Sequence, residues 1–74
     1  MSEQTLADYV ARVRAYLHTP EGDRNRRLMM VGFGWSYERA VAESVMHVCG
    51  LRIYERIREV ADQVLIEELK GEAA

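Results

Sequence analysis

Apolar residues recur at intervals of three and four along the first quarter of the chain. They are Leu6, Tyr9, Val10, Val13, Tyr16 and Leu17. This spacing predicts an amphipathic α-helix. Thr5 and Asp8 are spaced as in a capping box, where each side chain accepts a hydrogen bond from the other residue's backbone N–H. Ser2 is a competing N-cap one turn earlier. Because Pro20 disfavours helical backbone at the residue before it, we expect the first helix over residues 3–18.

A second, short helix is predicted over residues 23–31. Asp23 can cap its N-terminus, since a carboxylate there accepts a hydrogen bond from an otherwise unpaired backbone N–H. Gly32 stands where many helices end in a residue of positive φ. Phe33 follows directly and is placed to pack back against Leu28, as in the Schellman arrangement. The second helix is therefore expected to end at Gly32.

Ser36 is the predicted N-cap of a third helix over residues 36–49. Glu38 lies in the first turn, where a negative charge is favoured by the helix dipole. Gly34 and Trp35 join this helix to the one before it. The apolar face of the third helix consists of Tyr37, Val41, Val45 and Val48.

The apolar pattern changes phase at Gly50. At ~100° per residue, the next stripe lies nearly opposite the previous one; it consists of Ile53, Ile57, Val60 and Val64. Either the third helix ends near Gly50 and a last helix covers residues 51–69, or one kinked helix runs from Ser36 to Leu69. We favour the break, because glycine costs about 1 kcal/mol in a helix interior. Residues 71–74 are expected to fray.

These patterns together predict an all-α fold. The expected architecture is a small bundle of three to four helices with a long C-terminal helix. With 74 residues, the chain is expected to form a single domain over residues 1–74. Strand-like alternation of useful length is absent from the sequence.

The last predicted helix carries more apolar surface than a chain of this size is expected to cover. A chain this short buries only about 60% of the surface that it exposes when unfolded. An intrachain disulfide cannot supply the missing stability, since Cys49 is the only cysteine. Self-association is the expected remedy, so we predict a homodimer. The residues predicted to form its interface are Ile57, Val60, Val64, Leu65 and Leu69.

The sequence contains no recognisable catalytic constellation, and we predict that the chain is not an enzyme and uses no cofactor. His47 and Cys49 are two residues apart, so on a helix they point in nearly opposite directions and cannot converge on one ligand. Together with His18 they do not have the spacing of a metal site. Gly32 and Gly34 lack the preceding strand and the third glycine of a dinucleotide-binding loop.

Charge is unevenly distributed along the chain. The net charge is −2, which predicts no general affinity for nucleic acids or anionic membranes. Residues 12–58 contain nine arginines and five acids, whereas residues 59–74 contain one lysine and five acids. The longest apolar stretch, residues 28–35, is far shorter than the roughly 20 residues of a membrane span. The polar N-terminus predicts no secretory signal, so we expect a cytoplasmic protein.

The leading functional hypothesis is a small intracellular protein-interaction module that acts as a regulator, adaptor or inhibitor by binding a larger protein. Aromatic residues and arginine dominate the energetics of many interfaces, and the predicted partner-binding residues are therefore Arg24, Arg27, Phe33, Trp35 and Tyr37. Phe33 and Trp35 could instead fill the core. Small size and the lack of motifs are typical of phage or mobile-element accessory proteins, including inhibitors of host defence.

An alternative function is a dimeric nucleic-acid-binding regulator. It would place Arg24, Arg26 and Arg27 on phosphate groups. The acidic residues Glu21 and Asp23 lie in the same segment and dilute this positive charge. The sequence does not identify the partner in either hypothesis.

Overall fold

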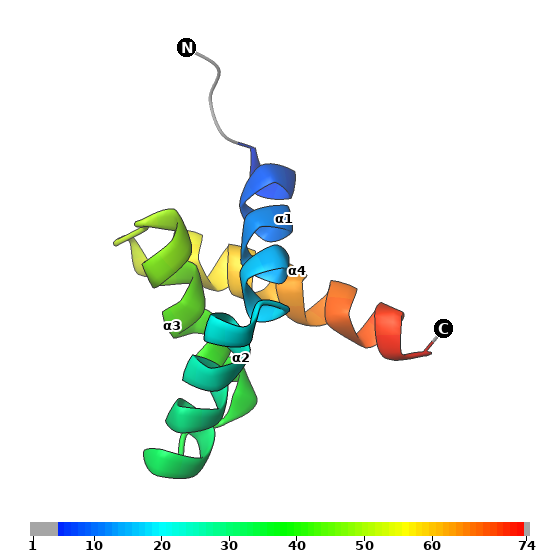
Figure 1. Cartoon of the computed structure of the whole chain (residues 1–74). Helices are drawn as coiled ribbons and strands as arrows, with labels where there is room; N and C mark the ends of the chain where they lie inside the picture. The colour runs from blue at the N-terminus through cyan, green and yellow to red at the C-terminus, as the bar shows by residue number, and fades with distance from the viewer. Residues whose placement is uncertain (1–4, 74) are drawn as a thin grey trace.

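The computed structural model describes residues 5–73 of the chain, and the side chains of residues 5–71 (Figure 1). This part of the chain contains α-helices and no strands, which confirms the predicted all-α class. The elements are α1 (Leu6–Leu17), α2 (Pro20–Arg27), the π-helical turn η1 (Leu28–Gly32), α3 (Tyr37–Cys49) and α4 (Tyr54–Ala73).

The predicted capping box at the start of α1 is confirmed. Thr5 Oγ1 accepts a hydrogen bond from the Asp8 N–H, and Asp8 Oδ2 accepts one from the Thr5 N–H, both at 3.2 Å. The helix therefore starts at Leu6 and not at residue 3. The competing cap, Ser2, lies outside the described residues.

The predicted start of the second helix was wrong by three residues. α2 begins at Pro20, and Thr19 is its N-cap, with Oγ1 accepting a 3.0 Å hydrogen bond from the Gly22 N–H. Proline suits the first helical position because the N–H that it lacks would have no partner there. Asp23 does not cap the helix. Its carboxylate is engaged instead by Arg26 at 2.8 Å and by Arg27 at 3.0 Å.

The prediction that Gly32 ends the second helix with a positive φ was also wrong. Gly32 belongs to η1, and the positive φ occurs at Gly34, at 72°. The Trp35 N–H donates a 3.1 Å hydrogen bond to the Met29 carbonyl six residues earlier. In the Schellman motif, the corresponding backbone hydrogen bond spans one residue fewer. The wider ring of a π-helical turn explains why the chain reverses two residues later than predicted.

α3 and α4 are separate helices, as favoured from the sequence. Ser36 Oγ accepts a 3.2 Å hydrogen bond from the Arg39 N–H, which confirms the predicted N-cap of α3. Gly50 ends α3 with a φ of 67° and donates a 3.0 Å hydrogen bond to the Met46 carbonyl. α4 then begins at Tyr54 and continues to Ala73, so it starts and ends later than the predicted range 51–69 and includes residues 71–73, which we expected to fray.

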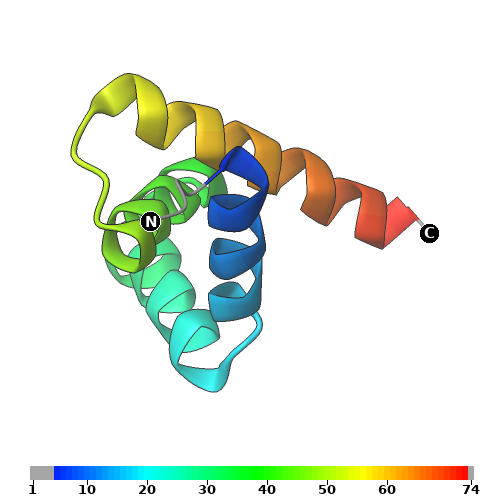
Figure 2. The same cartoon turned by 90° about the horizontal axis from the view of Figure 1, so that it is seen from above.

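The core lies where α1, α3 and α4 meet. It consists of Val10, Val13, Leu17, Val41, Val45, Ile57, Val60, Ala61 and Val64. α4 crosses the other helices, and its C-terminal end projects beyond them (Figure 2). The η1 turn lies at one end of the molecule, away from α4 (Figure 1). These two projecting parts form the surfaces described next.

Candidate partner-binding surface

The end of the molecule formed by η1 and the Gly34 turn exposes large apolar side chains. We call it the tip and define it by Leu28, Val31, Phe33 and Trp35. The exposed fractions are 86% for Val31, 61% for Phe33 and 56% for Leu28. Neighbouring apolar side chains that are exposed and surrounded by polar residues mark an interaction site.

Trp35 is held in the tip by two neighbours. Its ring centroid lies 5.3 Å from that of Phe33, and the Arg39 guanidinium carbon lies 3.9 Å from the Trp35 ring centroid. The second contact is a cation–π interaction, which stabilises the ring electrostatically. Trp35 is half-buried and Phe33 is exposed, and neither belongs to the core. The alternative that these two residues fill the core is therefore wrong.

Three arginines lie on α2, which leads to the tip, but Asp23 neutralises part of their charge. Arg26 donates a hydrogen bond to Asp23, and this bond, with the nearby charge of Arg27, holds the pKa of that carboxyl below its usual value. Arg24 precedes Leu28 by four residues and therefore lies on the same side of the helix. Among the described residues, no carboxylate forms an ion pair with the guanidinium of Arg24 or Arg39. These two charges remain available to a partner.

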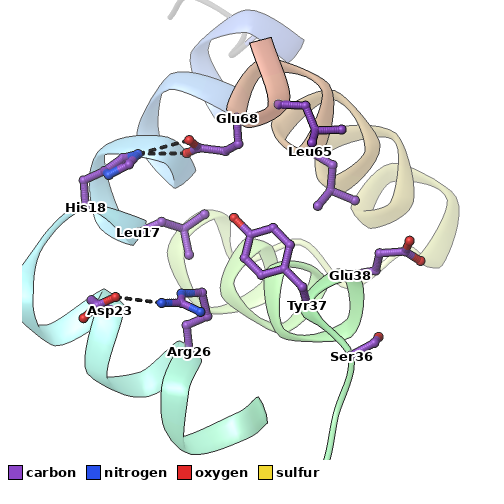
Figure 3. A pocket seen from close by; sticks show the side chains of 10 residues that line it. Leu17, His18, Asp23, Arg26, Ser36, Tyr37, Glu38, Leu65 and Glu68 are labelled. Atoms are coloured by element: carbon purple, nitrogen blue, oxygen red, sulfur yellow. Dashed lines mark hydrogen bonds and ion pairs between the residues drawn. The ribbon is translucent and has the colours of Figure 1, made fainter. Parts of the chain in front are cut away.

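A groove of about 760 Å³ lies beside the tip (Figure 3). Its apolar lining consists of Leu17, Tyr37, Leu65 and Leu69. Two polar pairs flank it: His18 Nε2 lies 3.0 Å from Glu68 Oε1, and Arg26 contacts Asp23. We call this surface the groove. Tyr37 is only two residues after Trp35, so the groove and the tip adjoin at the start of α3.

Tyr37 does not share the surface of the other predicted partner-binding residues. Its half-buried side chain lines the groove, and the guanidinium carbon of Arg26 lies 5.8 Å from its ring centroid. Phe33 and Trp35 lie in the tip, and Arg24 and Arg27 lie on the α2 turns that lead to it. Of the five predicted residues, the structure therefore shows contact only between Phe33 and Trp35.

The structure divides the residues predicted for self-association into two groups. Ile57, Val60 and Val64 are buried in the core of their own chain, because this stripe of α4 packs on α1 and α3. Their assignment to an intermolecular surface is corrected accordingly. Leu65 is half-buried and Leu69 is 64% exposed, and both line the groove.

The sequence interpretation missed two exposed residues of the tip, Leu28 and Val31. Their signal was the apolar run "LMMV" directly before the two glycines. In a helix that packs on its neighbours, such a run is half-buried. Here it projects from the end of the molecule, and only the three-dimensional arrangement of the helices reveals this.

The residues considered for metal or thiol chemistry are dispersed. The His47 ring packs against Tyr16, with 5.5 Å between the centroids, whereas His18 contacts Glu68 on α4. Cys49 is half-buried, and desolvation raises the pKa of its thiol, partly offset by the charge of Arg12. A thiol in such surroundings is a poor nucleophile at neutral pH. Among residues 5–71, no three potential metal ligands of the Cys, His, Asp or Glu type gather in one place.

Comparisons with known proteins found no matching family model, no matching curated protein and no matching solved structure. In the described part of the chain, none of the helices combines the length and the hydrophobicity that a membrane span requires.

Proposed function

We propose that the chain is a small protein-binding module that contacts a larger protein through its tip, and acts on that protein as a regulator, adaptor or inhibitor. The observation that carries this proposal is the exposure of Val31, Phe33 and Leu28 at one end of the molecule. Exposed apolar residues are common singly on protein surfaces. Here three exposed apolar residues lie together in one turn and directly beside it, next to a tryptophan. Packing within this chain does not explain their exposure.

The chemistry of the tip indicates the kind of surface that it would bind. Phe33 and Trp35 form a preassembled aromatic pair, which loses little conformational entropy on binding. Arg39 contacts Trp35, and Arg24 and Arg27 lie on the helix that leads to the tip, so a complementary partner would present an apolar pocket with carboxylates around it. Interface energy is commonly concentrated in such aromatic and arginine residues.

The proposal can be tested by capturing partners from a native lysate with the tagged chain. The informative variants are Val31→Glu and Phe33→Glu, since each places a charge in the centre of the tip. We expect each to weaken capture by roughly 30-fold, the effect of losing about 2 kcal/mol at an interface hot spot.

The matched control is Ile53→Glu. Ile53 is a similarly exposed apolar residue that lies just beyond the other end of α3, and the 13 residues of α3 separate it from the tip by about 20 Å. This variant should capture the same proteins as the unmodified chain. If the tip variants keep their helical circular dichroism and still capture the partner at full strength, the tip is not the contact surface.

A further inference from the structure

The charged side chains near the tip are mainly basic, and those that line the groove are mainly acidic. Arg24 and Arg27 lie on the helix that leads into the tip, Arg27 in an ion pair with Asp23, and Arg39 adds a further positive charge beside Trp35. The groove is lined by three carboxylates, those of Asp23, Glu38 and Glu68, and by one guanidinium, that of Arg26. Complementary potentials of this kind steer association and determine its orientation. Both surfaces are also apolar at their centres.

The shape of the molecule allows one copy to receive the tip of another. α4 continues for nine residues past its last core residue, Val64, a length of about 14 Å. A helix with its side chains is about 10 Å wide, so the ledge can accommodate one helical turn. Along this ledge Leu69 is exposed and Leu65 is half-buried. In Figure 1, the C-terminal end of α4 and the end of the chain reversal at η1 point in different directions.

We propose that the groove of each copy holds the tip of a second copy in a reciprocal, twofold-symmetric dimer. The tip and the groove meet at the start of α3, and in this dimer a twofold rotation places the tip of the second copy in the first groove and its groove against the first tip. The same contact then forms twice. A closed interface of this type requires twofold symmetry and leaves no unpaired tip to extend into a filament.

The size of the interface favours the reciprocal arrangement. A stable interface commonly buries about 800 Å² on each partner. A tip of one helical turn inserted once would fall short of this area, and the reciprocal contact doubles it. A second copy is the chemically complementary occupant, since its tip presents aromatic and aliphatic side chains with arginines. The groove that receives it is lined by leucines, a tyrosine and the carboxylates of Asp23, Glu38 and Glu68. Asp23 is paired with Arg26, and Glu68 with Arg14 and His18, whereas Glu38 forms no ion pair among the described residues.

This inference rests on the tip being a contact surface, as in the proposed function, and adds a form of regulation. The dimer covers the tip, so only the dissociated chain can bind the larger partner. Dilution, or a partner that competes for the tip, would shift the equilibrium from the dimer, in which the tip is covered, to the monomer, which can bind the larger partner.

The test is a mixing experiment with Phe33→Lys and Leu69→Glu, followed by sedimentation velocity. At tens of micromolar, the unmodified chain is expected to sediment as a dimer, with twice the monomer mass of 8.5 kDa. Each variant alone should dimerise at least 100-fold more weakly. An equimolar mixture should restore the dimeric species, because one native contact remains and the other pairs a lysine with a glutamate.

Three outcomes would overturn the inference. They are an unmodified chain that stays monomeric at several hundred micromolar, a Phe33→Lys variant that still dimerises, or a mixture without the heterodimer. Ile53→Glu is the control and should dimerise normally. Leu69→Glu has an intact tip and should still capture the larger partner, so failure of the dimer and failure of partner binding give different results.

Discussion

Gly22 is the position at which a single side-chain atom is least tolerated. It lies where α2 turns against the end of α1. A Cβ at this position would overlap the Tyr16 carbonyl oxygen and lie 2.7 Å from its carbonyl carbon. Both atoms belong to the backbone and cannot move without shifting a helix. We expect Gly22→Ala to destabilise the protein by about 2 kcal/mol, which lowers the melting temperature by roughly 10 °C for a chain of this size, as measured by circular dichroism.

Gly71→Ala is the matched control for this prediction. A Cβ there would meet only the flexible end of Arg14, at 4.0 Å, on an exposed part of α4. Alanine is favoured over glycine in a helix by up to about 1 kcal/mol, so the melting temperature should stay the same or rise. Equal melting temperatures for the two variants would contradict the close approach of α1 and α2 at Gly22.

The caps of α1 and α3 were predictable at the scale of the residue because they depend on neighbours within four positions. Thr5 with Asp8, Ser36 and Gly50 all belong to this class. By contrast, the N-cap of α2, Thr19, was wrongly assigned to Asp23. The choice between Gly32 and Gly34 as the residue of positive φ was not predictable in this way. It depends on the π-helical ring at η1, which adds one residue to the turn and leaves no local signal in the sequence.

Glu68 connects α1 to the projecting half of α4. Its side chain is 13% exposed, and its carboxylate lies 3.0 Å from His18 Nε2 and 3.6 Å from Arg14 Nε. Removing the carboxylate leaves the buried Arg14 Nε, which has no hydrogen bond, without its nearest negative charge. We expect Glu68→Ala to cost about 1 kcal/mol and to speed amide hydrogen exchange in residues 65–71, as measured by mass spectrometry.

Glu59→Ala provides the comparison, because Glu59 is an exposed carboxylate on the same helix. An exposed charge of this kind contributes little to stability, and exchange in residues 65–71 should stay unchanged. If the two variants exchange at the same rate in this segment, Glu68 does not hold the end of α4.

The helical faces were predictable at the scale of the element, whereas their partners were not. The stripe Ile57, Val60 and Val64 was identified as apolar, and the structure shows that α1 and α3 cover it. Periodicity shows that an apolar helical face must pack against another surface. It does not show whether that surface belongs to the same chain. The candidate site has the same limit, since Tyr37 and Leu69 come together only because α4 crosses the start of α3.

At the scale of the whole molecule, the core is small and consists mainly of valines. Its largest fully buried side chains are those of Val13, Val41, Val45 and Val64. Each removes little apolar surface from water, at roughly 25 cal/mol per Å². The all-α class was predictable from periodicity alone, while the groove arises from the crossing of α4 over the start of α3 and the tip from the π-helical turn η1.

Substitutions at Val64 and Leu69 test which part of α4 belongs to the core and which part is surface. The sequence placed both on one self-association surface, but Val64 is 0% exposed and Leu69 is 64% exposed. Val64→Ala removes two buried carbon atoms and should cost about 2 kcal/mol, which lowers the melting temperature by roughly 10 °C. Leu69→Ala should change the stability of the dissociated chain by less than about 0.5 kcal/mol.

Thermal unfolding at low micromolar concentration separates this effect from association, which raises the melting temperature by mass action. An equal loss of stability in the two variants would mean that the end of α4 folds back onto the core, and that the ledge of the groove does not exist.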